Sequence, residues 1–154
     1  MKIMHLMPNI LGNKIFKKTI LALSDILEYQ LVVVPISVGN IRETISNNLL
    51  DYDLSNHNIS LSVLKAYSKL DRYLFSPKRN KIVKNLLKDW NNITIDMIHA
   101  HFLVSMGSVA YEIKREKGIP YIVSVRATDV YLFLRYAFFL RRYILKVLIN
   151  AKRI

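Results

Sequence analysis

The chain alternates short apolar runs with longer segments whose apolar residues recur every three or four positions. The short runs match buried strands in length and predict four of them, at residues 2–7, 31–36, 95–100 and 120–125. The longer segments predict helices, one opening at Gly12–Asn13 and running to Leu27, and others over 61–75, 78–90, 105–117 and 130–149. Residues 39–60 are polar and rich in asparagine, and no element is predicted there.

Glycine and proline residues at two places predict where helices end or break. Gly118, with Pro120 just beyond it, predicts the end of the 105–117 helix. Ser76–Pro77 predicts a break between the two helices on either side of it. Strands alternating with helices are typical of an α/β domain, so residues 1–154 are expected to form one open, parallel, Rossmann-like sheet with helices on both faces.

The net charge of the chain predicts an anionic partner. The chain has 23 Lys and Arg against 11 Asp and Glu, which gives a net charge of +12. Nucleic acid, an anionic membrane surface or a phosphorylated substrate would suit this excess, and a merely solvated basic surface is the alternative. The chain has no cysteine, which excludes a disulfide scaffold, a thiolate metal site and a cysteine nucleophile.

The most apolar stretch, residues 130–149, carries four Arg and Lys side chains that disfavour a membrane span. A cytoplasmic protein is therefore expected, peripheral on the inner face of the plasma membrane if it binds lipid. The cations expected to form membrane- or anion-binding faces on the predicted helices are Lys65, Lys69, Arg72, Lys78, Arg79, Arg135, Arg142 and Lys146.

Candidate chemistry falls where strands end, because open α/β sheets bind ligands beyond the carboxyl ends of their strands. The loop after the first strand holds Asn9 and Gly12, and Gly12 permits close backbone approach to a ligand. Arg126 follows the 120–125 strand and suits an anionic group. Thr128 and Asp129 come next, either in a binding loop or as caps of the following helix.

The 95–100 strand ends in two histidines on one face of the sheet, His99 and His101. His99 is expected in the core, and His101 further out, where it would act on a substrate hydroxyl or a proton. A zinc site would need a third ligand, and only His5, His57 and scattered carboxylates remain. No metal and no cofactor are therefore expected, and no GxSxG or phosphate-binding glycine motif is present.

Three blocks together resemble a known family: Asp96–Phe102 (DMIHAHF), Gly107–Tyr111 (GSVAY) and Gly118–Asp129 (GIPYIVSVRATD). They follow the order D-x-I-H-A-H … G … A … G-I-P-Y-V-x-T-x-H-G-x-D of GT-B-fold glycosyltransferases. Among these the chain resembles the large retaining group (glycosyl transferase group 1, family 4 type) that includes bacterial envelope and capsule polysaccharide transferases. Lys2–Leu6 and Asn150–Ile154 resemble the first strand and the N-A-x-x-I start of a later one.

The resemblance implies the N-terminal, acceptor-side half of a GT-B fold, incomplete at its C-terminus and without the donor-binding domain. It implies transfer of a sugar from a nucleotide-sugar to a saccharide or lipid-linked acceptor in cell-envelope polysaccharide biosynthesis. In it His101 aligns with a histidine facing the acceptor, and Asn9, Gly12, Thr128 and Asp129 lie in substrate loops. The nucleotide-sugar would bind only with the C-terminal domain, so this chain alone is expected to be inactive.

Two readings from other classes stay open beside this one. A basic nucleic-acid- or anion-binding α/β module without enzymatic activity suits the charge, but no recognised nucleic-acid motif is present. A receiver-like signalling domain suits the alternation of elements, but it would need acidic residues after its first strand, where Pro8–Leu11 supplies none.

Overall fold

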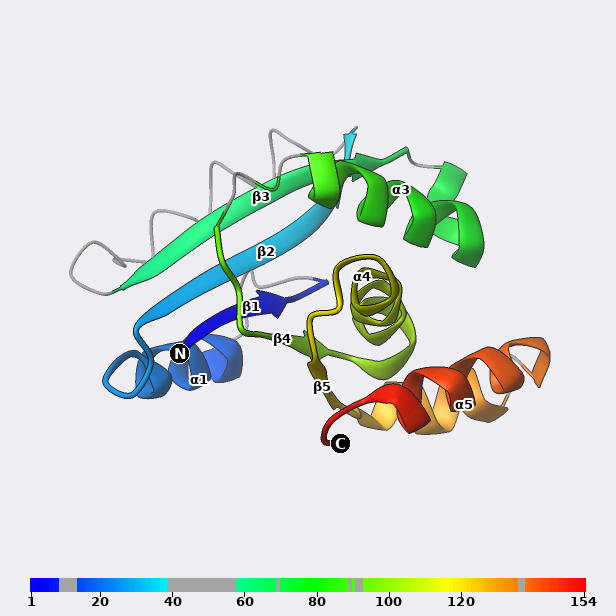
Figure 1. The fold of residues 1–154 in the computed structure, drawn as a ribbon. Coiled ribbons are helices and arrows are strands. Elements are labelled where there is room, and N and C mark those ends of the chain that lie inside the picture. Colours follow the sequence, from blue (N-terminus) through cyan, green and yellow to red (C-terminus); the bar gives the residue numbers. More distant parts are fainter. Residues whose placement is uncertain (9–13, 39–57, 69, 89, 91–92, 136–137) are drawn as a thin grey trace.

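The computed structural model describes residues 1–8, 14–38, 58–68, 70–88, 90, 93–135 and 138–154. The strands are β1 (Lys2–Leu6), β2 (Tyr29–Ser37), β3 (Ile59–Tyr67), β4 (Met97–His101) and β5 (Tyr121–Ser124). They form a five-stranded, all-parallel sheet in the order β3-β2-β1-β4-β5 (Figure 1). This is an α/β, Rossmann-like fold, as the alternation of elements predicted.

Helices cover both faces of this sheet (Figure 1). Helix α1 (Lys14–Ser24) packs Phe16 and Ile20 against Val32 and Val34 of β2. The opposite face carries the larger core. It is built from α3 (Phe75–Lys88), α4 (Ser108–Lys117) and α5 (Arg141–Asn150). Side chains along β1 point alternately to the two faces of the sheet. Met4 and Leu6 face the larger core, and Met7, just after the strand, faces α1.

Short helical segments join the main elements. These are η2 (Leu70–Tyr73), η3 (Leu103–Gly107), η4 (Asp129–Leu134) and η5 (Phe138–Leu140). Both η3 and η4 are π-helical, a form often found at functional sites. Beyond β5, Arg153 bridges Ile122 in parallel, so the last residues of the chain lie alongside that strand.

Several sequence predictions are confirmed within one to three residues, namely β1, α1, β2, β4, α4 and β5. Gly118 ends α4 with φ 73°, and its N–H donates to the Lys114 carbonyl at 2.9 Å. This is the left-handed cap that the glycine predicted.

The predicted helix over 61–75 is wrong, because residues 59–67 form β3. Among the described residues β3 is an edge strand that pairs only with β2, and its surface is only partly buried. The predicted break at Ser76–Pro77 is also wrong. Pro77 lies in the first turn of α3, where the missing N–H costs no hydrogen bond.

The predicted helix over 130–149 is not one helix. Its residues divide among η4, η5 and α5. The helical stripe expected to join Arg135 with Arg142 and Lys146 is therefore not continuous. Within the described part of the chain, no helix is both long and apolar enough to cross a membrane.

Candidate functional site

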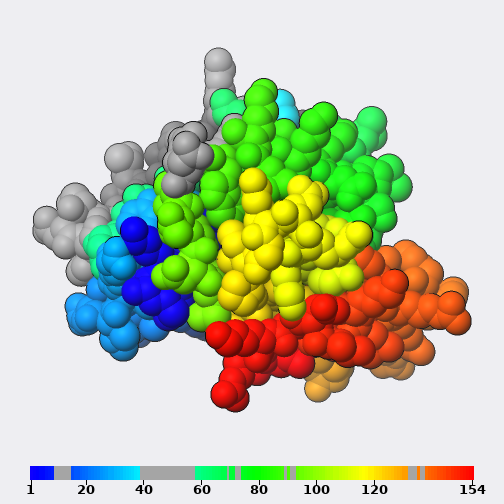
Figure 2. All heavy atoms as spheres, in the orientation of Figure 1, coloured from blue at the N-terminus to red at the C-terminus, as the bar shows by residue number. Residues whose placement is uncertain are grey.

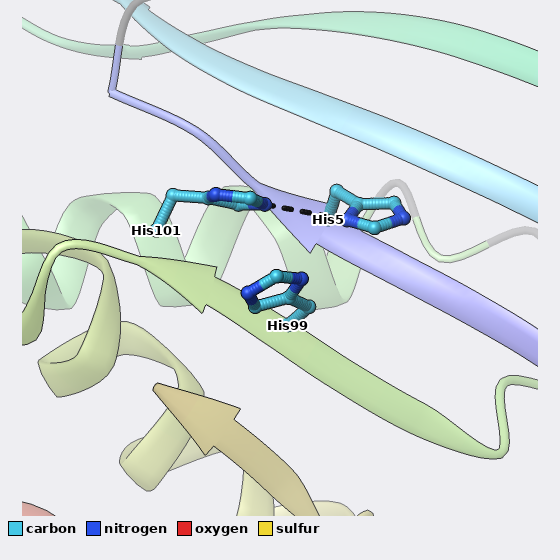
Figure 3. Close-up of side chains that lie close together, drawn as sticks. All are labelled: His5, His99 and His101. Atoms are coloured by element: carbon cyan, nitrogen blue, oxygen red, sulfur yellow. Dashed lines mark hydrogen bonds between the residues drawn. The ribbon is translucent and has the colours of Figure 1, made fainter. Parts of the chain in front are cut away.

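Three histidines meet on the α1 face of the sheet. His5 lies on β1, opposite His99 of β4 in the parallel register, and His101 follows two residues later on the same face. One ring nitrogen from each lies within 4.8 Å of the other two. Figure 3 shows the rings gathered from the two neighbouring strands, with a hydrogen bond joining His5 and His101.

A chain of hydrogen bonds fixes the protonation of two of these rings. The Gln30 amide nitrogen donates to the Ile20 carbonyl at 3.1 Å, so its oxygen accepts from His5 Nε2 at 3.1 Å. Neutral His5 must then accept at Nδ1, and His101 Nε2 is the donor at 3.3 Å. This leaves a lone pair on His101 Nδ1, which is buried and has no hydrogen-bond partner among the described residues.

Burial keeps the imidazoles neutral. It lowers the pKa of His5 to about 4, assisted by the neighbouring His99. It also lowers the pKa of His99 to about 4 and that of His101 further, and the positive charge of Arg126 contributes to both. At neutral pH all three rings therefore carry nitrogen lone pairs, and the cluster can accept hydrogen bonds or bind a cation.

Aromatic and basic groups border the histidines at the carboxyl ends of β4 and β5. The Phe16 ring packs edge-on against His101, with centroids 5.2 Å apart. The Arg126 guanidinium lies 5.2 Å from the Phe16 ring and 6.0 Å from that of Phe102, and its buried Nε has no partner among the described residues. An unsatisfied guanidinium nitrogen beside aromatic rings suits an anionic ligand.

The backbone at the end of β4 is strained. Phe102 has φ 85° and ψ 126°, a conformation that favours glycine. Such strain costs about 1–3 kcal/mol and persists only where the surroundings hold it. It turns the chain directly from His101 into η3, with the Phe102 N–H donating to the Ser124 carbonyl at 3.1 Å.

Asp129 holds the loop after β5 against the start of η3. Its buried carboxylate accepts backbone N–H bonds from Leu103 at 2.9 Å, Val104 at 3.1 Å and Arg126 at 3.0 Å. The last is the N3-to-N-cap bond of a capping box, so Asp129 caps its own helix as well as η3. The capping role predicted for this residue is therefore confirmed, whereas Thr128 is exposed.

The expected burial of the two strand-end histidines is reversed. His101 was predicted to lie outermost, but it is only 1% exposed. His99 was predicted in the core, but it is partly exposed, and its Nε2 is 2.8 Å from Ser124 Oγ. The reason is the packing on the α1 face, where the Phe16 ring lies edge-on against His101 and His5 forms a hydrogen bond with it. Asn9 and Gly12 lie outside the described residues.

The predicted cationic positions that the structure describes are distributed over several elements. Lys65 is exposed on a strand, Lys69 lies outside the described residues, and the side chain of Arg72 is not described. Lys78 lies 4.7 Å from the Tyr67 ring, and Arg79 is 3.7 Å from Glu112 and stacks on Tyr143. Exposed positions nearer the C-terminus are Arg135, Arg142 and Lys146.

Sequence reasoning named His5 only as one of the remaining histidines and did not place it beside the pair, and it missed the partners Gln30, Phe16 and Ser124. A signal for His5 was available. In the common strand order of this fold, β1 lies beside β4, so a histidine near the end of β1 comes opposite the His99–His101 pair. Gln30 and Phe16 gave no comparable signal, because their contacts depend on how α1 packs on the sheet.

No protein-family model matches the chain, and no curated protein is significantly similar to it.

Proposed function

We propose that this chain is the acceptor-side domain of a glycosyltransferase that uses a nucleotide-sugar to extend a saccharide or lipid-linked acceptor of the cell envelope. The proposal rests on the blocks that resemble the GT-B family. The observation that supports it best is the partly exposed His99, close enough to Arg126 to be affected by its positive charge, at the carboxyl ends of β4 and β5. Ligands of open α/β sheets bind at this edge.

Each group has a chemical part in this proposal. Arg126, with its unpartnered Nε, would pair with a phosphate or an acidic sugar of the acceptor. His99 is exposed enough to hydrogen-bond an acceptor hydroxyl. His101, the residue proposed from the family as catalytic, is buried behind it, and we expect it to reach the acceptor only if Phe16 moves aside.

Saturation-transfer NMR of the purified chain tests this directly. The probes are a short-chain prenyl-diphosphate disaccharide, as acceptor analogue, and a uridine-diphosphate sugar, as donor. We expect saturation of the acceptor analogue that is lost in Arg126→Ala and kept in the control Arg115→Ala, whose exposed guanidinium instead bonds Glu112. Tight donor binding without acceptor binding, or sugar transfer by this chain alone, would contradict the proposal.

The proposed domain would work on an anionic membrane surface, and α5 supports this part. The helix buries Ile144 and Val147, while its outer stripe exposes Leu145 and Ile149 beside Arg142 and Lys146. In Figure 2 this segment, orange to red, forms an outer edge of the molecule. Just before it, Phe138 and Phe139 are 71% and 72% exposed. Exposed apolar groups interleaved with cations are typical of interfacial helices.

Vesicle co-sedimentation separates this surface from a merely solvated one. We expect binding to phosphatidylglycerol vesicles, no binding to phosphatidylcholine vesicles, and loss of binding at high salt. Phe138→Ser with Phe139→Ser should weaken it strongly, whereas Lys117→Glu, on an exposed position at the end of α4, should weaken it only slightly. Equal sedimentation with both lipids would contradict the proposal. Tighter binding to nucleic acid would favour the basic binding module instead.

A further inference from the structure

The three histidines have the spacing of a metal-ligand set. A tetrahedral zinc ion bound at about 2.0–2.1 Å by two imidazoles separates their nitrogens by about 3.3–3.4 Å. His5 Nδ1 and His101 Nε2 are 3.3 Å apart, and a nitrogen of His99 lies within 4.8 Å of both. A small rotation of His99 would complete three ligands around one ion, provided that the proton of His101 moves from Nε2 to Nδ1. The ion then replaces the hydrogen bond between His5 and His101.

Two of these rings are held in place by neighbouring side chains, in the way that metal-bound histidines usually are. Such histidines usually bond a second protein group through the nitrogen that does not bind the metal. Gln30 does this for His5, holding its Nε2 and leaving Nδ1 toward the cluster. Ser124 does it for His99, 2.8 Å from its Nε2, which leaves Nδ1 for the ion.

We propose that His5, His99 and His101 bind one divalent transition-metal ion, with zinc as the expected species. Three imidazoles without a carboxylate suit Zn²⁺ and its neighbours rather than Mg²⁺ or Ca²⁺. Three protein ligands leave a fourth position open, as in catalytic zinc sites. The positive charge of Arg126 acts on His99 and adds to the charge of the bound ion. The fourth ligand is therefore expected to be an anion, such as hydroxide or a phosphate oxygen.

This inference does not depend on the proposed glycosyltransferase function, because it rests on the histidine geometry alone. Either can fail while the other holds: acceptor binding is read by NMR without metal, and metal binding is read without an acceptor. The chain also supplies its own control. It has four histidines, and the fourth, His57, lies outside the described residues and outside the proposed ligand set.

The test uses the untagged full chain, freed of metal with chelator, and titrates it with Zn²⁺ by calorimetry and with Co²⁺ by visible absorption. We expect one equivalent of each to bind, an intense tetrahedral Co²⁺ spectrum, and no binding of Mg²⁺. His99→Ala should abolish the spectrum, and Gln30→Ala should weaken binding by about 10–100-fold. His57→Ala should bind as the wild type does.

A second measurement needs no variant and so does not depend on whether a variant folds. Histidines of the wild-type chain are labelled with diethylpyrocarbonate, with and without Zn²⁺, and the labelling is measured by mass spectrometry. Zn²⁺ should protect His99, and the extent of labelling at His57 should not change when Zn²⁺ is added. The proposal is overturned if the wild-type chain binds no Zn²⁺, if folded His99→Ala binds it equally well, or if His57→Ala loses it. Labelling of His99 that Zn²⁺ does not change would also overturn it.

Discussion

Asp129 accepts the backbone N–H of Leu103 at 2.9 Å and so ties the loop after β5 to the turn that ends β4. The same carboxylate bonds two further N–H groups, those of Val104 and Arg126. Both histidine-bearing β4 and Arg126 are therefore positioned through one side chain. The first two N–H groups of η3, those of Leu103 and Val104, are satisfied by this carboxylate and are not available to a ligand.

Asp129→Ala should destabilise the protein by about 2–4 kcal/mol, because it leaves three N–H groups without a charged acceptor in a buried place. Urea unfolding followed by circular dichroism measures this. Thr128→Ala, at an exposed neighbouring position, should change stability by less than about 0.5 kcal/mol. Equal stability of the two variants would show that the carboxylate does not hold the loop.

His101→Ala should destabilise the metal-free protein more than His99→Ala does. His101 is buried, bonds His5 and packs on Phe16, so its loss should cost about 2–4 kcal/mol. Partly exposed His99 should cost about 1 kcal/mol. Denaturant midpoints measured in the presence of chelator give the comparison, and the opposite ranking would contradict the burial of these rings.

Acid should remove a stabilising interaction of Asp71. Hydrogen bonds from Lys81 and Ser68 lower the pKa of its carboxyl to about 2. A carboxyl with a lowered folded-state pKa stabilises the protein above its unfolded value, and this contribution is lost as the pH falls through the folded one. The Tm difference between wild type and Asp71→Asn should be full above about pH 4 and vanish near pH 2.

Gly118→Ala should cost about 1–2 kcal/mol through backbone strain alone. The residue has φ 73°, and nothing lies within 4 Å of the position that a Cβ would take. Asparagine tolerates this conformation better, so Gly118→Asn should cost less. Thermal unfolding of both variants tests the ranking, and a larger cost for asparagine would point to a steric cause that the structure does not contain.

The sequence predicted the elements whose burial is uniform. The run at 31–36 is apolar because β2 lies between two neighbours with both faces covered, and such a run has few other interpretations. In α4, periodicity and a terminal Gly118 agreed, which made its end predictable. In β2 and in α4, the residue types along the chain and their burial in the folded protein indicate the same secondary structure.

The failures come where burial is mixed. In β3, Leu61 and Leu64 are three apart and resemble a helix face, but they lie on opposite faces of the strand, Leu61 toward the α1 layer and Leu64 in the larger core. Its exposed Lys65 strengthened the false helical stripe. Between η4 and α5 no glycine or proline marks the division, so a continuous helix was the natural expectation. For the site, the sequence supplied the His99–His101 pair, but only the pairing of β1 with β4 brings His5 to it.

The pairing of His5 with His101 also has a consequence for the order in which the chain folds. The two residues are 96 positions apart, so β1 has no partner on that side until most of the chain has been synthesised. Strands β1, β2 and β3 can pair earlier, and for that time one edge of β1 is open to other chains. Such distant contacts make folding slow. The histidine cluster is therefore completed late, and a chain released before β4 emerges should aggregate through β1 and contain no site.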